Sequence, residues 1–186
     1  VCAYNTTGGG GNIWTSSDSG ATWTMVPYNV FGATNQWTAI TSSSDGTKLA
    51  ATAYDGNIWI SSNSGATWTE DTSVGATKKW RGITSTADGT KLAAVAYAGN
   101  IWTSSDSGVT WTENTSTPTT TWYFITSSSD GSKLTALTWG QGKWKSNDSG
   151  ATWTQDTSTS IQGTGITSSA DGSKVVAVAW MQSIWT

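Results

Sequence analysis

The sequence contains no histidine, a single cysteine and few charged residues, and each shortage removes a class of site or partner. Without histidine, the chain lacks the commonest general base and any histidine-bound metal. Cys2 cannot form an internal disulfide, so we interpret it as a small apolar strand residue, with a disulfide to another molecule as the alternative. The net charge of −3 argues against a nucleic-acid partner. No run of 18 apolar residues occurs, so we expect no membrane-spanning helix.

Tryptophan, by contrast, is abundant and recurs at fixed spacings. Four pairs are each nine residues apart, and the residues inside the pairs are nearly the same. These pairs are Trp14/Trp23, Trp59/Trp68, Trp102/Trp111 and Trp144/Trp153. A marker stands 22 residues before the first member of a pair: Trp37, Trp80 and Trp122, with Gly163 in that slot before Trp185. A chain that repeats every 41 to 45 residues is built from one supersecondary unit copied several times.

The repeat defines a single domain of successive units. Their approximate ranges are 1–36, 37–79, 80–121, 122–162 and 163–186. Within a unit, a first strand ends at an Asp-Gly pair, which is a strong hairpin signal because glycine tolerates the positive φ of a tight turn. The second strand is almost entirely apolar, so we expect both of its faces to be buried. The tryptophan pair then marks strands three and four, on either side of a Ser-Ser-Asp-Ser-Gly loop.

Repeated four-stranded antiparallel units predict an all-β fold, a β-propeller of about five blades. A helical interpretation fails because the apolar period is near two and turn residues interrupt it every eight to twelve residues. The expected strands number eighteen, with the first unit lacking its first strand and the last unit lacking its fourth. We therefore expect incomplete terminal blades. Their unpaired edges favour pairing with another copy of the chain, in a ring or a filament.

The length variation of the repeat is confined to the connection between strand four and the next strand one. Alternate turns of an antiparallel meander lie at opposite ends, so these connections share one face with the turns between strands two and three. We call this the variable face, since insertions in repeat proteins map to one face that often binds ligands. Its distinctive aromatic and basic residues are candidates for binding a glycan. They are Tyr28, Trp80, Arg81, Trp122 and Tyr123.

The loop between paired tryptophans resembles the Asp-box, or BNR, repeat of sialidase-like β-propellers, whose pattern is S-x-D-x-G-x-T-W. The resemblance rests on Ser16, Asp18, Gly20 and Trp23, then Asn63, Gly65 and Trp68, then Asp106, Gly108 and Trp111, and finally Asp148, Gly150 and Trp153. The second copy departs from the pattern because Asn63 replaces the carboxylate. The resemblance implies a loop at the outer edge of a blade, away from the active face. We assign it a structural role, with Asp accepting backbone hydrogen bonds and Gly in a left-handed conformation.

Sialidases and endoglucanases belong to the group that the chain resembles, so catalysis has to be weighed residue by residue. Sialidases use three arginines around the substrate carboxylate, whereas this chain has only Arg81. Glycoside hydrolysis needs two carboxylates in different environments. The only glutamates, Glu70 and Glu113, occupy equivalent positions of neighbouring units, and the aspartates fall in recurring turn and loop positions. We predict a non-catalytic member of this group that binds no cofactor. We also predict no metal site, because one carboxylate per loop is too few for Ca²⁺.

The leading hypothesis is a non-enzymatic extracellular scaffold that self-assembles into an oligomer or fibre. The first alternative is a lectin that binds glycans on the variable face. The second is a fragment of a larger propeller that docks another protein. Glycosylation sequons at Asn5 and Asn114 favour a secreted glycoprotein, with Asn114 the better candidate of the two. The sequon at Asn147 is the weakest because it lies inside a loop of the Asp-box type.

Overall fold

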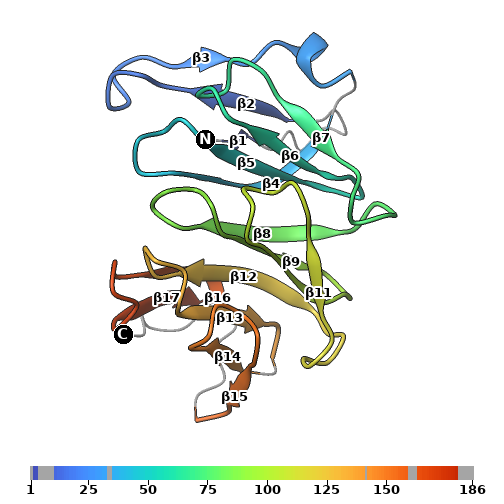
Figure 1. The fold of residues 1–186 in the computed structure, drawn as a ribbon, viewed down its shortest axis with the longest axis vertical. Helices are drawn as coiled ribbons and strands as arrows, with labels where there is room; N and C mark the ends of the chain where they lie inside the picture. The colour runs from blue at the N-terminus through green and yellow to red at the C-terminus, as the bar shows by residue number, and fades with distance from the viewer. Residues whose placement is uncertain (1, 4–10, 33–34, 141, 159–162, 180–186) are drawn as a thin grey trace.

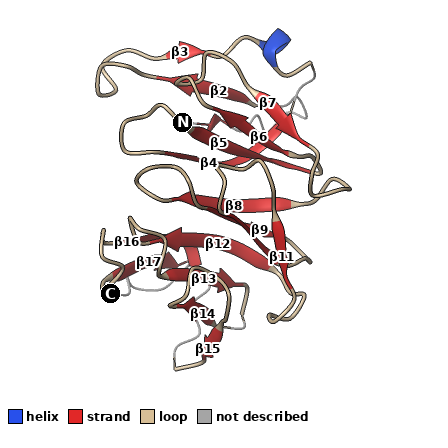
Figure 2. Cartoon of the chain, viewed as in Figure 1, coloured by secondary structure: helices blue, strands red, loops and turns tan. Residues whose placement is uncertain are grey.

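The structure is a computed structural model that describes residues 2–3, 11–32, 35–140, 142–158 and 163–179. The described residues form antiparallel β-sheets, with one 3-10 turn, η1 (Tyr28–Val30), between the first two sheets (Figure 2). This confirms the predicted all-β class and its repeated four-stranded sheets. No helix in these ranges is long and apolar enough to cross a membrane.

Three of the sheets have four strands each. Their strands are β4 (Gln36–Ser42), β5 (Leu49–Tyr54), β6 (Ile58–Ser61) and β7 (Thr69–Asp71); β8 (Trp80–Ser85), β9 (Leu92–Ala96), β10 (Ile101–Ser104) and β11 (Thr112–Asn114); and β12 (Trp122–Ser127), β13 (Leu134–Thr138), β14 (Lys143–Ser146) and β15 (Thr154–Asp156). The first sheet consists of β1 (Cys2–Ala3), β2 (Asn12–Thr15) and β3 (Thr24–Met25), and the last of β16 (Gly163–Ser168) and β17 (Val175–Ala179). The strand expected at 183–186 lies outside the described residues.

Neighbouring sheets are joined through their first strands, which lie side by side in the order β4, β8, β12 and β16. Hydroxyl pairs connect these strands: Thr41 with Ser85, Thr84 with Ser127 and Thr126 with Ser168, at 2.8, 3.0 and 3.1 Å. In Figure 1 the first four sheets follow one another along the long axis, and the red strands β16 and β17 lie beside β12 and β13, well apart from the blue strands β2 and β3. The described sheets therefore form an open arc of propeller blades.

The apolar core lies between successive sheets, and the second strand of each complete sheet contributes to two parts of it. In β5, Ala51 packs in one cluster with Ile13 of the first sheet, whereas Ala50 packs in another with Trp80 of the following sheet. In β9, all five residues are buried. The alternation of side chains along a strand produces this two-sided burial. The expectation that strand two is buried on both faces is confirmed in β5, β9 and β13, but it is wrong for β17, where only Ala177 is buried and Val178 is 42% exposed.

The marker tryptophans are the largest side chains of these cores. Trp80 and Trp122 are fully buried, and Trp37 is nearly so. Each contacts the first tryptophan of the pair in its own sheet edge to face: Trp37 with Trp59, Trp80 with Trp102, and Trp122 with Trp144, with centroids 6.3, 6.3 and 6.0 Å apart. The fixed tryptophan spacing therefore reflects a ring contact that every complete sheet repeats.

Candidate functional site

The variable connections lie beside the turns between strands two and three, as the alternation of turns predicts. Gly56, in the turn between β5 and β6, forms an isolated bridge with Lys78, which precedes β8. Gly99, in the turn between β9 and β10, forms the same bridge with Thr120, which precedes β12. Side chains from three successive sheets meet on this variable face.

A β-bulge near the start of each first strand shapes the candidate site. The register with the second strand shifts between Trp37 and Ala39, Trp80 and Gly82, Trp122 and Phe124, and Gly163 and Gly165. A bulge adds one residue to one strand and changes the direction of its side chain. The residue inside the bulge is Thr38 in β4, Arg81 in β8, Tyr123 in β12 and Thr164 in β16. Two bulges therefore carry large side chains, and two carry threonine.

Arg81 lies among three tyrosine rings. Its guanidinium carbon is 4.7 Å from the ring centroid of Tyr54, 5.3 Å from that of Tyr123 and 5.5 Å from that of Tyr97. Tyr54 ends β5, Tyr97 follows β9 and Tyr123 occupies the bulge of β12, so the three rings come from three sheets. Cation–π attraction of this kind contributes roughly 0.5–2 kcal/mol per contact, more where water is excluded.

The rings continue the arrangement toward the next sheet. Tyr97 and Tyr123 meet edge to face at 6.0 Å, and Tyr123 contacts Trp139, which follows β13, at 5.4 Å. Trp139 is 47% exposed, which is unusual for so large an apolar side chain in this chain. We call Arg81, Tyr54, Tyr97, Tyr123 and Trp139 the Arg81 cluster. It is a surface of aromatic rings around one cation.

The structure divides the five predicted glycan-binding residues. Arg81 and Tyr123 are neighbours in the cluster, but Trp80 and Trp122 are fully buried and present no ring face to a ligand. Their inclusion was wrong because the residue before the bulge points into the core, whereas the bulge residue points out. Tyr28 is exposed on η1, and no ring contact joins it to the cluster in the described part of the chain.

Sequence reasoning missed Tyr54, Tyr97 and Trp139. All three occupy one repeat position, the end of strand two, where the chain carries an aromatic residue in each complete unit. That recurrence was visible in the sequence, but it suggested packing rather than a surface. The bulge, which directs Arg81 toward this position, has no sequence pattern that distinguishes it from regular strand.

The loops between the paired tryptophans are closed by side-chain hydrogen bonds. In the third loop, Gly108 N donates to Ser104 Oγ at 2.9 Å, Thr110 N donates to Asp106 Oδ1 at 2.9 Å, and Thr110 Oγ1 donates to Asp106 Oδ2 at 2.6 Å. The loops around Asp18 and Asp148 repeat these bonds. In the second loop Asn63 Oδ1 accepts from Thr67 N and its Nδ2 donates to Thr67 Oγ1. The amide therefore replaces the carboxylate without opening the loop.

The tryptophan under the first loop differs from its counterparts. Trp23 is 46% exposed, whereas Trp68, Trp111 and Trp153 are buried. An ideal Cβ at Gly65 would approach Leu49 and Thr15, which lie in its own and the preceding sheet, whereas one at Gly20 would meet only the ring of Trp23 within 4 Å. Packing from two sheets thus covers the later loops and not the first.

We expect the chain to lose stability in acid between about pH 4 and about pH 2. Hydrogen bonds from threonine hydroxyls, backbone N–H groups and serine hydroxyls lower the pKa of Asp18, Asp106 and Asp148 from the ordinary 3.8 to about 2. Their ionised forms therefore stabilise the fold above pH 4, and this contribution disappears as the folded carboxylates are protonated. Urea unfolding midpoints between about pH 6 and about pH 2 measure the loss. Asp106→Asn, which copies Asn63, should flatten the pH dependence, and an unchanged slope would contradict this origin.

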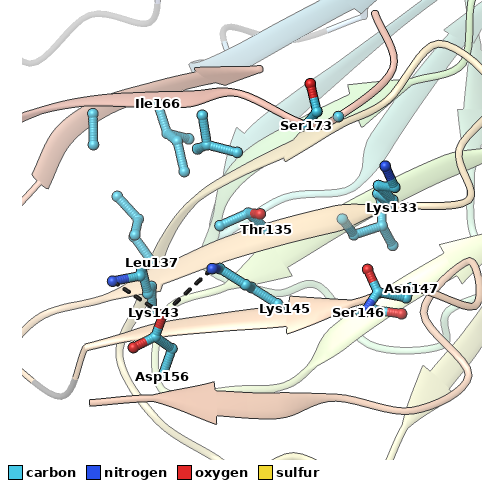
Figure 3. A pocket seen from close by; sticks show the side chains of 14 residues that line it. Lys133, Thr135, Leu137, Lys143, Lys145, Ser146, Asn147, Asp156, Ile166 and Ser173 are labelled. Carbon is cyan, nitrogen blue, oxygen red and sulfur yellow. Dashed lines mark ion pairs between the residues drawn. The ribbon is translucent and has the colours of Figure 1, made fainter. Parts of the chain in front are cut away.

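A groove of about 560 Å³ lies between the sheet of β12–β15 and the sheet of β16–β17 (Figure 3). Its one carboxylate, Asp156, forms ion pairs with Lys143 and Lys145 at 3.2 and 3.3 Å. Hydrogen bonds from Ser158 first, and then from Lys143, hold the pKa of Asp156 far below its ordinary value. The groove thus lacks the pair of carboxylates with contrasting pKa values that glycoside hydrolysis needs.

Most of the remaining acids also have structural partners. Glu70 accepts a hydrogen bond from Asn57, and Glu113 accepts one from Asn100, each at 2.9 Å and in equivalent places. The pKa of Asp45, Asp88 and Asp130, in the Asp-Gly turns, is lowered to about 2, chiefly by a hydroxyl of the preceding serine or threonine. Among the described residues, no group of three His, Cys, Asp or Glu side chains could hold a metal ion.

The better glycosylation candidate has a structural role in the fold. Asn114 Nδ2 donates to the carbonyl of Gly150 in the next sheet at 2.7 Å, and its Oδ1 accepts from Ser116 N at 3.0 Å. A glycan on Nδ2 would displace the contact between sheets, so the geometry opposes the glycosylation hypothesis at this residue. Asn5 lies outside the described residues. Cys2 lies in β1, as expected for a strand residue.

No protein-family model matches the chain, and no curated protein matches it. Solved structures resemble it in fold. A structure of the nidogen/laminin complex superposes with a TM-score of 0.68 and 15% identity, over 91% of this chain and 64% of that one. YCF48 bound to a D1 peptide superposes with a TM-score of 0.62 and 16% identity, over 82% and 52% of the two chains. An ancestral GH74 enzyme superposes with a TM-score of 0.63 and 16% identity, over 91% of this chain and 24% of that one.

These similarities show the fold. The matched structures are β-propellers, and this chain takes the same arrangement of four-stranded blades. The chain spans 52% of the YCF48 chain, 24% of the GH74 chain and 64% of the nidogen/laminin chain, less than two thirds in each case. Its open arc therefore corresponds to part of the blade set of each.

Proposed function

We propose that this chain is a non-catalytic β-propeller scaffold of the Asp-box type that docks a segment of another protein on its variable face. The Arg81 cluster carries the proposal, because three sheets contribute half-buried tyrosine rings around one cation, beside the exposed ring of Trp139. Aromatic residues and arginine dominate the energetics of protein interfaces. Two of the similar propellers, YCF48 and the nidogen/laminin complex, are described with a peptide or protein partner, which supports a docking role.

Selection of random peptides on the immobilised chain tests docking without assuming a partner. We expect enriched peptides to lose most of their binding to Tyr123→Ala and Trp139→Ala, since both rings belong to the surface. Val109→Ala is the matched control, because Val109 is an exposed apolar residue of a loop at the opposite end of its sheet. No enrichment, or enrichment that these two variants leave unchanged, would overturn the docking proposal.

Self-association is the second candidate, and the connection between first strands favours it. Each sheet pairs a threonine with a serine of the next, yet Ser42 in β4 and Thr167 in β16 have no such partner among the described residues. Both are exposed, so a second copy could extend the ladder by pairing its Ser42 with Thr167 in a head-to-tail contact. Light scattering should then show multimers that Thr167→Arg dissolves. A monomer at all concentrations would contradict this candidate.

The lectin alternative is weaker after the burial of Trp80 and Trp122, although Arg81 and Tyr123 remain available to it. An extracellular location stays part of the proposal and rests on the sequon at Asn5, since the geometry opposes glycosylation at Asn114. The self-association candidate and the docking proposal are compatible, because Ser42 and Thr167 lie toward the ends of β4 and β16, whereas Arg81 and Tyr123 lie at the starts of β8 and β12.

A further inference from the structure

Arg81 is a cation without an anionic partner in the described part of the chain. The ion pairs found there join Lys143 and Lys145 to Asp156, far along the sequence from Arg81. Its Nε is buried and has no hydrogen-bond partner among the described residues. The tyrosine rings stabilise the positive charge but offer their π faces, not a lone pair in the plane of the guanidinium. The terminal Nη donors form no hydrogen bond or ion pair within the described part of the chain, so they, rather than the buried Nε, remain available to an acceptor that comes from outside.

The fold does not require an arginine at this position. In the preceding sheet the bulge carries Thr38, whose hydroxyl bonds to Thr52 Oγ1 at 3.0 Å and donates to Thr52 O at 3.1 Å. Threonine recurs at the bulge of β16, where Thr164 Oγ1 contacts Val178 O at 3.5 Å. A threonine in the bulge therefore forms a hydrogen bond to the second strand of its own sheet. The long, charged side chain of Arg81 forms no such bond, which points to a role beyond folding.

The local charge indicates an anionic ligand. Lys78 and Lys79 immediately precede β8, and Lys79 Nζ lies 5.8 Å from the ring of Tyr54, which also contacts Arg81. This concentration of positive charge contrasts with the chain as a whole, whose net charge is −3. A planar carboxylate matches the two-pronged geometry of a guanidinium better than it matches a lysine ammonium.

The rings distinguish between a sugar and a peptide as the carrier of that carboxylate. Stacking on a pyranose needs a free aromatic face, yet the guanidinium lies over Tyr54, Tyr97 and Tyr123. Tyr97 and Tyr123 also meet nearly perpendicularly, at 81°. Trp139 is the ring of the cluster with the largest exposed surface, and one such ring suits an apolar side chain beside the anionic group.

We infer that the Arg81 cluster is a recognition site for an acidic peptide, in which Arg81 binds a carboxylate and Trp139 packs against a neighbouring apolar side chain. The inference rests on the proposed docking function and specifies its ligand. Both oxygens of the carboxylate would accept from the guanidinium while the tyrosines hold its plane. The carboxylate has two sources, an Asp or Glu side chain and a free C-terminus.

Fluorescence anisotropy with short labelled peptides tests the inference directly. One probe carries Asp and Glu beside leucine with an amidated end, a second carries Asn and Gln with a free carboxyl end, and a third is neutral and amidated. We expect binding of the first or the second, which identifies the source, and none of the third. Arg81→Ala should weaken binding about tenfold or more. Rising ionic strength should weaken it further.

Two variants separate recognition from folding and from general attraction. Arg81→Lys keeps the charge and the aliphatic stem, so it should fold, yet it should lose most of the affinity because lysine cannot bind in two-pronged fashion. Lys174→Ala removes an equal charge from an exposed side chain near the β16–β17 turn and should change little. Equal binding of acidic and neutral probes, or full binding by both Arg81 variants, would overturn the inference.

Two further outcomes separate this inference from the function on which it rests. Peptides enriched in the random selection that depend on Trp139 but not on Arg81 would overturn the carboxylate site and leave docking intact. Saturable binding of an oligosaccharide of glucuronate, with no binding of any acidic peptide, would overturn the peptide inference in favour of a lectin.

Discussion

Trp122→Ala should lower the free energy of unfolding by about 3–5 kcal/mol, the usual cost of removing a buried aromatic ring. Trp122 is fully buried and packs in one cluster with Val95 and Ile101 of the preceding sheet. It also contacts Trp144 of its own sheet edge to face at 6.0 Å. Removal would leave a cavity in the apolar packing that joins these two sheets. Denaturant unfolding followed by far-UV circular dichroism measures the loss.

Trp139→Ala is the matched control, because it removes the same side chain from a position that is 47% exposed. We expect its cost to be about 1 kcal/mol or less, since surface substitutions usually stay near 0.5 kcal/mol and the ring contact that is lost is the one with Tyr123. Equal costs for the two variants would mean that Trp122 is not a core residue. Binding should show the reverse order, with Trp139→Ala more affected than any Trp122 variant that remains folded.

The parts of the fold that the sequence predicted are those set by local chemistry that repeats. Asp-Gly turns, small apolar second strands and paired tryptophans recur in every complete unit, so their strands could be located without a structure. In the complete sheets Trp59 lies opposite Ala51 and Glu70, and Trp102 lies opposite Ala94 and Glu113. Because the spacing of these residues along the sequence is constant, the strands pair in the same register in both sheets.

The candidate site could be predicted only in part, because its key feature is a difference between neighbouring residues on one strand. Trp80 and Arg81 both mark the variable face in the sequence, yet the bulge sends the first into the core and the second outward. Such a bulge depends on pairing with the adjacent strand, and a sequence pattern of period two does not reveal it. Asn114 illustrates the same limit, since its bond to Gly150 joins residues 36 positions apart.

Gly131→Ala should destabilise the chain by about 2–5 kcal/mol, through two separable effects. Gly131 has a φ of +69°, which costs an alanine roughly 1–2 kcal/mol. Its new Cβ would also stand 2.6 Å from Thr86 Cγ2 of the preceding sheet. That methyl group cannot rotate away freely, because Thr86 Oγ1 donates to Asp88 and accepts from the backbone N–H of Lys91 at 3.1 Å. Overpacking of this kind costs about 1–3 kcal/mol more.

Gly46→Ala isolates the backbone effect, because Gly46 occupies the same turn position with a φ of +71° and nothing lies within 4 Å of the new Cβ. Gly46→Ala should therefore lower the free energy of unfolding by only about 1–2 kcal/mol, the cost of the left-handed backbone conformation. Thr86→Ser removes the obstructing methyl group and keeps the hydroxyl, as in the other turns, where Ser43 and Ser128 occupy this position. In the double variant, Thr86→Ser should therefore recover most of the excess cost of Gly131→Ala over Gly46→Ala. A coupling energy near zero in this cycle would show that the two sheets are not in contact at Thr86 in solution, and that the blades separate more easily than their shared packing implies.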